Sequence, residues 1–283
     1  MGFFPGRVAV EHARADAVVK AAGGDMDRGV ASHGAARIAW RAEGLGPAVL
    51  LLPSLGRGAE DFDMVAPLLA AAGFRVVQPE PRGIGGSAGP MEGLTLYDLA
   101  GDAAAALAAA ATGPAVVAGH AFGNWVARAM AAARPDLVRG VALLAASIDT
   151  ALDPAIRASI DGSFDPLLPE AERLGHLQRG YFAPGHDARV WLAGWHAPVA
   201  RMQRAATAAT DAGWKRVAER VPVLYVAAAE DSIAPVPTEA RLREALGPRV
   251  AMVVVQRAGH ALLPEQPAAV AAALVDFTRR MQA

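Results

Sequence analysis

The sequence predicts an α/β protein with a mostly parallel sheet and helices on both faces. Short apolar runs alternate with alanine-rich stretches along most of the chain, and each run ends at glycine, proline or a polar residue. The runs that predict buried strands are residues 48–52, 75–78, 115–118, 141–145, 223–227 and 251–255. The stretches that predict helices are residues 59–72, 94–111, 124–133, 238–246 and 267–281.

The chain divides into a core and one long insertion. No clear period marks residues 1–34, which predict an N-terminal extension, although Met26 would also serve as a start. The core then spans residues 35–148 and 217–283. The intervening residues 149–216 are too many for an unstructured loop, and several prolines divide them, so we expect a helical cap made of short helices.

Composition and charge exclude several functions. The chain of 283 residues has 27 Lys and Arg against 28 Asp and Glu, so no basic surface is available to bind nucleic acid. It has no cysteine, which excludes disulfides and a cysteine nucleophile. No secretory signal or long apolar run is present. We expect a cytoplasmic protein that binds a small molecule and no membrane. The oligomeric state is left open, with a homodimer as one option.

The first candidate for chemistry is the turn Gly-His-Ala-Phe-Gly at residues 119–123. It follows an apolar strand and precedes a helix. Two glycines around one central residue allow a tight turn that lifts the central side chain above the sheet, at the N-terminus of a helix. The pattern is that of the nucleophile elbow G-x-S-x-G, with Ala121 where serine stands. Taken alone, it is also compatible with an ordinary glycine-rich turn.

An acid and a histidine follow later strands. Asp231 comes after one predicted strand and His260 after the last, so both should lie at the carboxyl edge of the sheet near Ala121. A lone Asp there is more often a helix cap, and a lone His is more often structural. Asp149 and Glu230 are fallback positions for the acid. The order of the three positions nevertheless favours a catalytic set.

Two backbone N–H groups could form an oxyanion hole. The loop at residues 52–58 follows the first strong strand, and Leu55 is the candidate for one donor. The residue after the nucleophile position, Phe122, would supply the other donor. The alternative is an ordinary glycine-containing loop.

Aromatic residues of the insertion predict an apolar pocket between the cap and the sheet. We expect the substrate to contact Ser54 and His120 near the turn, and Phe182, Trp191 and Trp195 in the cap. These aromatic residues could equally pack the cap onto the core. The histidines lack the spacing of metal ligands, so no metal and no cofactor are expected.

From about residue 35 onward the sequence resembles the α/β-hydrolase superfamily. The resemblance rests on Leu-Pro-Ser-Leu-Gly at 52–56, Pro-Arg-Gly-Ile-Gly-Gly-Ser at 81–87, the turn at 119–123, Asp231 with Pro235, and Gly259-His260. It implies an α/β-hydrolase fold with an eight-stranded sheet, a helical cap after the sixth strand and a catalytic triad without cofactor. In such a triad His260 is the general base and Asp231 orients it. The second motif is characteristic of capped esterases, lactonases and epoxide-hydrolase-like members.

Ala121 departs from this family because a methyl group cannot attack a carbonyl. Pro53-Ser54, where His-Gly is usual, is a second departure. We favour a hydrolase of an ester, lactone or related acyl bond in a form without its serine, either an engineered Ser→Ala variant or a native one. Asn124, beside the turn, favours native alanine.

Two other functions stay open at this point. A dyad of His260 and Asp231 could activate water directly, or act in a lyase or a cofactor-independent oxygenase. Alternatively, the protein binds a small molecule without turnover. A nearby serine could replace the missing hydroxyl, and the candidates are Ser54, Ser87 and Ser147.

Overall fold

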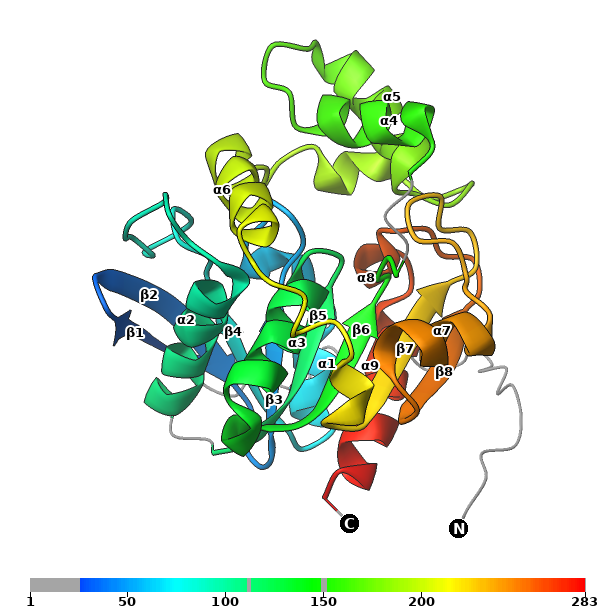
Figure 1. Cartoon of the computed structure of the whole chain (residues 1–283). Helices are drawn as coiled ribbons and strands as arrows, with labels where there is room; N and C mark the ends of the chain where they lie inside the picture. Colours follow the sequence, from blue (N-terminus) through cyan, green and yellow to red (C-terminus); the bar gives the residue numbers. More distant parts are fainter. Residues whose placement is uncertain (1–25, 111–112, 149–151, 283) are drawn as a thin grey trace.

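One eight-stranded sheet organises the computed structural model, which describes residues 26–110, 113–148 and 152–282 (Figure 1). The sheet order is β1-β2-β4-β3-β5-β6-β7-β8, and all neighbours from β4 to β8 run parallel. The strands are β1 (Asp27–His33), β2 (Ala36–Glu43), β3 (Ala48–Leu52), β4 (Arg75–Pro79), β5 (Ala115–His120), β6 (Val138–Leu144), β7 (Val223–Ala228) and β8 (Val250–Val255). The predicted mostly parallel sheet is confirmed.

Strands β1 and β2 correct the boundary expected at residue 34. They form an antiparallel hairpin in which His33 pairs with Ala36 across a two-residue turn, and Gly34 in that turn has a φ of 55°. Residues 27–33 are therefore part of the sheet. Apolar patterning does not predict this strand, because β1 is an edge strand with mostly exposed side chains and so has no apolar run.

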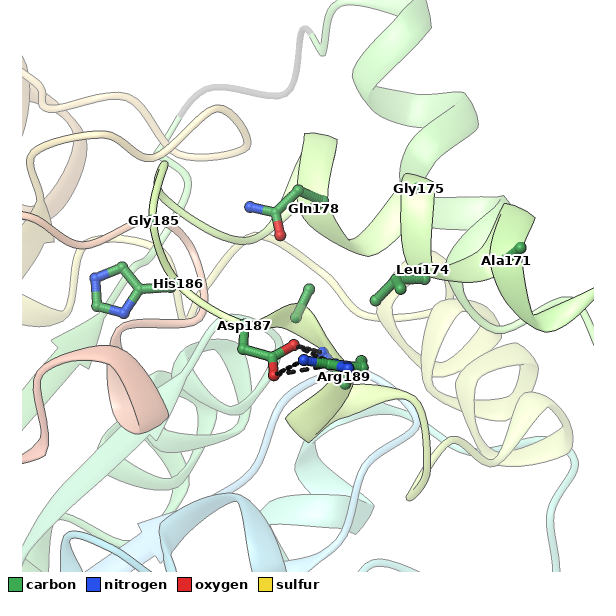
Figure 2. A pocket seen from close by; sticks show the side chains of 9 residues that line it. Ala171, Leu174, Gly175, Gln178, Gly185, His186, Asp187 and Arg189 are labelled. Carbon is green, nitrogen blue, oxygen red and sulfur yellow. Dashed lines mark hydrogen bonds and ion pairs between the residues drawn. The ribbon is translucent and has the colours of Figure 1, made fainter.

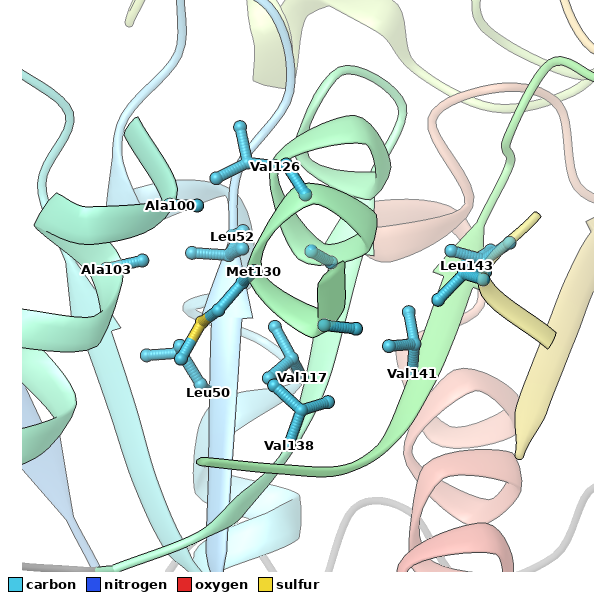
Figure 3. Close-up of a cluster of buried hydrophobic side chains, with 14 of the residues drawn as sticks. Leu50, Leu52, Ala100, Ala103, Val117, Val126, Met130, Val138, Val141 and Leu143 are labelled. Carbon is cyan, nitrogen blue, oxygen red and sulfur yellow. The ribbon is translucent and has the colours of Figure 1, made fainter. Parts of the chain in front are cut away.

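Side chains alternate along the strands and so build a core on each face of the sheet. On β3, Leu50 and Leu52 pack against α2 and α3, whereas Val49 and Leu51 pack against α1 and α9. Figure 3 shows the first of these clusters, where Met130 of α3 lies among the strand residues. The helices are α1 (Ala66–Ala71), α2 (Leu96–Ala109), α3 (Gly123–Ala133), α7 (Glu239–Leu246), α8 (Leu262–Glu265) and α9 (Pro267–Arg280).

The single helix predicted over residues 59–72 is divided in the structure. A 3-10 turn, η1 (Ala59–Phe62), precedes α1. Two further 3-10 turns, η2 (Pro135–Leu137) and η4 (Val217–Glu219), flank the core strands. Among the described residues, no helix is long and apolar enough to cross a membrane.

Short helices follow β6, where the sequence predicts the insertion. They lie over the carboxyl ends of the strands (Figure 1). In chain order they are α4 (Pro154–Ser163), α5 (Glu170–Gly180), η3 (Ala188–Trp191) and α6 (Ala197–Ala208). Their own buried cluster includes Leu177 and Trp191 and reaches Ala261 beside the predicted histidine. The insertion therefore packs directly on the edge of the sheet where the candidate residues lie.

A buried ion pair between the loop after β4 and helix α2 gives a test of the fold. Arg82 Nε and Nη2 donate to the two carboxylate oxygens of Asp102 at 2.6 and 2.9 Å, and both side chains are buried. The change Asp102→Asn would leave a buried guanidinium without its anion, so the free energy of unfolding should fall by about 3–5 kcal/mol. Urea denaturation measures the change.

The control is Asp136→Asn, which removes the carboxylate from an exposed pair with Arg134 of the same chemical type. Water screens that pair, so the free energy of unfolding should stay unchanged. Equal effects of the two substitutions would contradict the placement of Asp102 in the core.

Candidate active site

The turn after β5 has the geometry of a nucleophile elbow with alanine at its apex. Ala121 has a φ of 45°, a conformation that non-glycine residues rarely adopt. A Cβ atom on Gly119 would lie 2.2 Å from the carbonyl oxygen of Gly123, and one on Gly123 would lie 2.2 Å from that of Leu52. Only glycine fits these two positions. Ala121 is partly exposed although both its neighbours in the chain are buried.

His260 and Asp231 form a buried pair. Nδ1 of His260 lies 2.9 Å from Oδ2 of Asp231 and 3.1 Å from Oδ1, and the Asp231 side chain is fully buried. The N–H groups of Ile233 and Ala234 each donate to Oδ1 of Asp231 at 2.8 Å, which fixes the carboxylate. Because an ionised carboxylate only accepts hydrogen bonds, Nδ1 of His260 carries the proton. Its Nε2 atom has no partner among the described residues and is left as an acceptor.

Hydrogen bonds hold the backbone on both sides of His260. The Gly259 N–H donates to Oε2 of Glu265 at 2.6 Å, and the Ala261 N–H donates to the Tyr181 carbonyl oxygen at 2.9 Å. Oε1 of Glu265 also accepts the Ala183 N–H at 2.7 Å, so one buried carboxylate joins the histidine loop to the insertion. Burial raises the pKa of Glu265.

His120 forms a hydrogen bond with the carbonyl oxygen of His260. Nε2 of His120 lies 2.8 Å from that oxygen, and since a carbonyl only accepts, Nε2 must carry the proton. Burial, together with the nearby His260, lowers the pKa of His120 to about 3. His120 is therefore neutral at physiological pH and acts as a fixed donor. Its Nδ1 has no partner within the described ranges.

Of the two expected oxyanion donors, Leu55 lies on the loop after β3 and Phe122 lies in the elbow itself. Leu55 is partly buried, Phe122 is buried, and neither N–H has an acceptor in the part of the chain that the structure describes. The neighbouring Ser54 is buried, and its N–H lies 3.4 Å from Oδ2 of Asp61. Two donors without an acceptor suit a developing negative charge, and their role in catalysis stays a prediction.

The aromatic residues of the insertion pack against one another and against the site. Trp191 is buried, and its ring lies 5.8 Å from that of His120 and contacts Phe182 and Trp195. The Arg57 guanidinium lies 4.5 Å from the Trp191 ring and 4.8 Å from the Trp195 ring. Whether Phe182, Trp191 and Trp195 contact a substrate stays a prediction. Arg57 is a site neighbour that the sequence analysis did not single out.

Neither of two hollows on the described part of the surface is lined by Ala121, Asp231 or His260. A wide, open one lies between α5 and the following loop, with Gln178 on its wall and an ion pair of Asp187 and Arg189 (Figure 2). A narrow one adjoins Phe122 and Gly123. Within the described residues, no three His, Asp or Glu side chains gather as a metal site would require.

The fallback residues are placed less favourably than Asp231. Glu230 is exposed, and Asp149 lies outside the described residues.

Ser87, a candidate replacement for the missing serine hydroxyl, is engaged elsewhere. Its hydroxyl donates to the Glu80 carbonyl oxygen at 2.9 Å and accepts the Ala39 N–H at 2.8 Å.

Asn124, the residue that the sequence singles out beside the turn, binds the elbow directly. Its Nδ2 donates to the carbonyl oxygen of Ala121, and its Oδ1 accepts from Nη1 of Arg128 at 3.3 Å. Arg128 is a buried cation that also donates to the Lys215 carbonyl oxygen and lies 4.5 Å from the Trp214 ring. Burial lowers its pKa to about 9. The elbow thus has a polar support on α3.

Comparison with known proteins identifies the class. A model of the alpha/beta hydrolase family matches residues 49–273. Cfl2 from Burkholderia cenocepacia is 25% identical with a TM-score of 0.72, covering 92% of this chain and 98% of its own. A thermophilic esterase from Thermogutta terrifontis, with malate bound, is 22% identical with a TM-score of 0.68, covering 91% and 100%. Est816, described as an N-acyl homoserine lactone degrading enzyme, is 20% identical with a TM-score of 0.71, covering 88% and 100%.

The chain therefore belongs to the α/β-hydrolase family, and its fold is the one that the resemblance implied.

The neutral state of His120 gives a prediction about acid stability. The unfolded chain binds a proton at this histidine below pH ~6.5, whereas the folded chain binds one only near pH 3. The free energy of unfolding should therefore fall as the pH drops from ~6.5 towards 3, by up to about 1.4 kcal/mol per unit from this group. In His120→Gln, whose amide N–H can still reach the His260 carbonyl, the fall should be shallower.

Denaturant titrations from pH 7 to 4 measure both slopes. A parallel loss of stability in the variant and the parent would mean that His120 titrates normally in the folded protein.

Proposed function

We propose that this protein hydrolyses an ester or lactone bond of a small molecule by direct attack of water, without an acyl-enzyme. The observation that carries the proposal is the buried pair of His260 and Asp231, whose free Nε2 belongs to the same site as the partly exposed residue Ala121. The smaller alanine leaves room where a serine hydroxyl would lie. A water molecule in that space would take the place of the nucleophile.

The reaction needs one general base and one oxyanion site. Nε2 of His260 takes a proton from water while the resulting hydroxide attacks the carbonyl carbon, and Asp231 stabilises the imidazolium that forms. The N–H groups of Leu55 and Phe122 hold the negative oxygen of the tetrahedral intermediate. When the intermediate collapses, the leaving alkoxide takes the proton back from His260. The acid and the alcohol are released, or one hydroxy acid in the case of a lactone.

Two features support this substrate class. Structural neighbours include proteins described as an esterase and as a lactone-degrading enzyme. The rings of Tyr181 and Trp191, from the helical insertion, lie against the rings of His260 and His120, and such apolar surroundings would favour an apolar substrate.

The change Ala121→Ser tests the proposal. The parent should release nitrophenol from p-nitrophenyl esters slowly and without a burst. The serine variant should show a burst equal to the enzyme concentration and a rate higher by about 10³-fold or more, because the hydroxyl restores a covalent route. Stopped-flow absorbance measures both phases.

A second substitution separates an enzyme from a binding protein. His260→Ala should lower the parent's rate by about 10²-fold or more, since no other base replaces the imidazole. His186→Ala, which removes a partly exposed histidine of the insertion, is the matched control and should change nothing. A parent that binds esters but never turns them over would contradict hydrolysis and indicate a non-catalytic binding protein.

A further inference from the structure

We propose that the narrow hollow beside the elbow is a subsite for a short acyl group bearing a neutral oxygen atom, and that the side-chain amide of Gln203 recognises this oxygen. This subsite rests on the proposed function, because that function identifies the bound group as the acyl part of a substrate.

The hollow adjoins the segments that carry the expected oxyanion donors. Its wall includes Leu52 and Pro53 from the end of β3, and Phe122 and Gly123 from the elbow. Its volume is about 50 Å³, which is small beside the roughly 300–1,000 Å³ of typical ligand pockets. A group entering from the scissile carbonyl would therefore be only a few atoms long.

Gln203 presents an unpaired donor to this hollow. The side chain extends from α6 of the insertion, lines the hollow and is only 2% exposed. Its Oε1 atom accepts the Gly56 N–H at 2.7 Å. A backbone N–H can only donate, so the orientation of the amide is fixed and its NH2 group is left over. Nε2 makes no hydrogen bond to any described residue, and a buried amide of this kind favours a ligand that supplies an acceptor.

The other polar groups of the hollow exclude an anionic ligand. Arg82 and Asp102 are paired with each other, and Nη1 of Arg82 donates to the Pro90 carbonyl oxygen at 3.0 Å. Neither charge is free for a ligand. Glu80 also lines the hollow, its Oε2 accepts the Ala59 N–H at 3.0 Å and burial raises its pKa, so this carboxyl offers an anion no positive charge.

The remaining lining is apolar and suits the carbon atoms of the group. Ile38, Leu99 and Val126 supply side chains from β2, α2 and α3. One donor in an apolar pocket fixes the position of one oxygen, as in other small-molecule sites. A keto or ether oxygen on a short acyl chain has the required chemistry.

The test measures binding of unreactive amides, so that it does not depend on turnover. The probes are N-methylbutanamide against N-methyl-3-oxobutanamide, and N-methylpentanamide against N-methyl-4-oxopentanamide. In at least one pair the oxo compound should bind about 3–10-fold more tightly, the range expected for one hydrogen bond. The anionic N-methylsuccinamate should bind no better than the plain amides. Equal affinities within both pairs would overturn the proposal.

The change Gln203→Glu isolates the donor. Glutamate keeps an oxygen for the Gly56 N–H and replaces the NH2 group by a second oxygen, so the preference for oxo compounds should vanish while the plain amides bind as before. Gln178→Glu, the same change at an exposed position of the open hollow (Figure 2), should keep the preference. A preference that survives in Gln203→Glu would contradict the assignment.

A measurement on the parent decides the question even where the variant fails to fold. The side-chain NH2 signals of Gln203 in 15N–1H spectra should shift with the oxo compound of the preferred pair and stay in place with its plain partner. Unmoved signals would refute the subsite. An absence of ester turnover would contradict the proposed hydrolysis and leave this binding result standing, so the two failures are distinguishable.

Discussion

The contact between Asp231 and His260 is the interaction on which the whole site depends. It joins the ends of β7 and β8, which are neighbours in the sheet, while β5 brings Ala121 to the same edge. Each partner is also held by contacts outside the pair: two backbone N–H groups donate to the Asp231 carboxylate, and His120 donates to the His260 carbonyl oxygen. A carboxylate fixed in this way orients one imidazole nitrogen and leaves the other free for chemistry.

Alanine at the apex changes the chemistry without loosening the turn. Ala121 keeps a positive φ, a strain of about 1–3 kcal/mol that surrounding packing must maintain. That packing comes from close backbone contacts at Gly119 and Gly123, and from the hydrogen bond between Asn124 and the Ala121 carbonyl. Under the proposed function, the Phe122 N–H of this turn would help to stabilise an oxyanion. The methyl group of Ala121 itself cannot form a covalent bond with a substrate.

The sequence predicts the parts of this structure that short-range patterns determine. Strands such as Ala48–Leu52 are found as predicted because every residue is buried and apolar. Strand β1 is not predicted, because its exposed side chains form no such apolar run. The candidate residues at 121, 231 and 260 are recognisable because each lies within a few residues of the end of a strand. The roles of Gln203 and Glu265 are not recognisable from the sequence, because they depend on partners distant in the chain. Gly56 and Gln203, for example, are 147 residues apart. The motif around Glu265 signals only the start of a helix.

The tautomer of His260 is the most direct test of this account. Long-range 15N–1H spectra of histidine-labelled protein at neutral pH, assigned with Asp231→Asn, report which imidazole nitrogen carries the proton. The geometry requires a proton on Nδ1 and a bare Nε2, with the Nδ1 signal changed or lost when the carboxylate is removed. A proton on Nε2, or a spectrum unaffected by the substitution, would show that the two side chains do not form the pair on which the site is built.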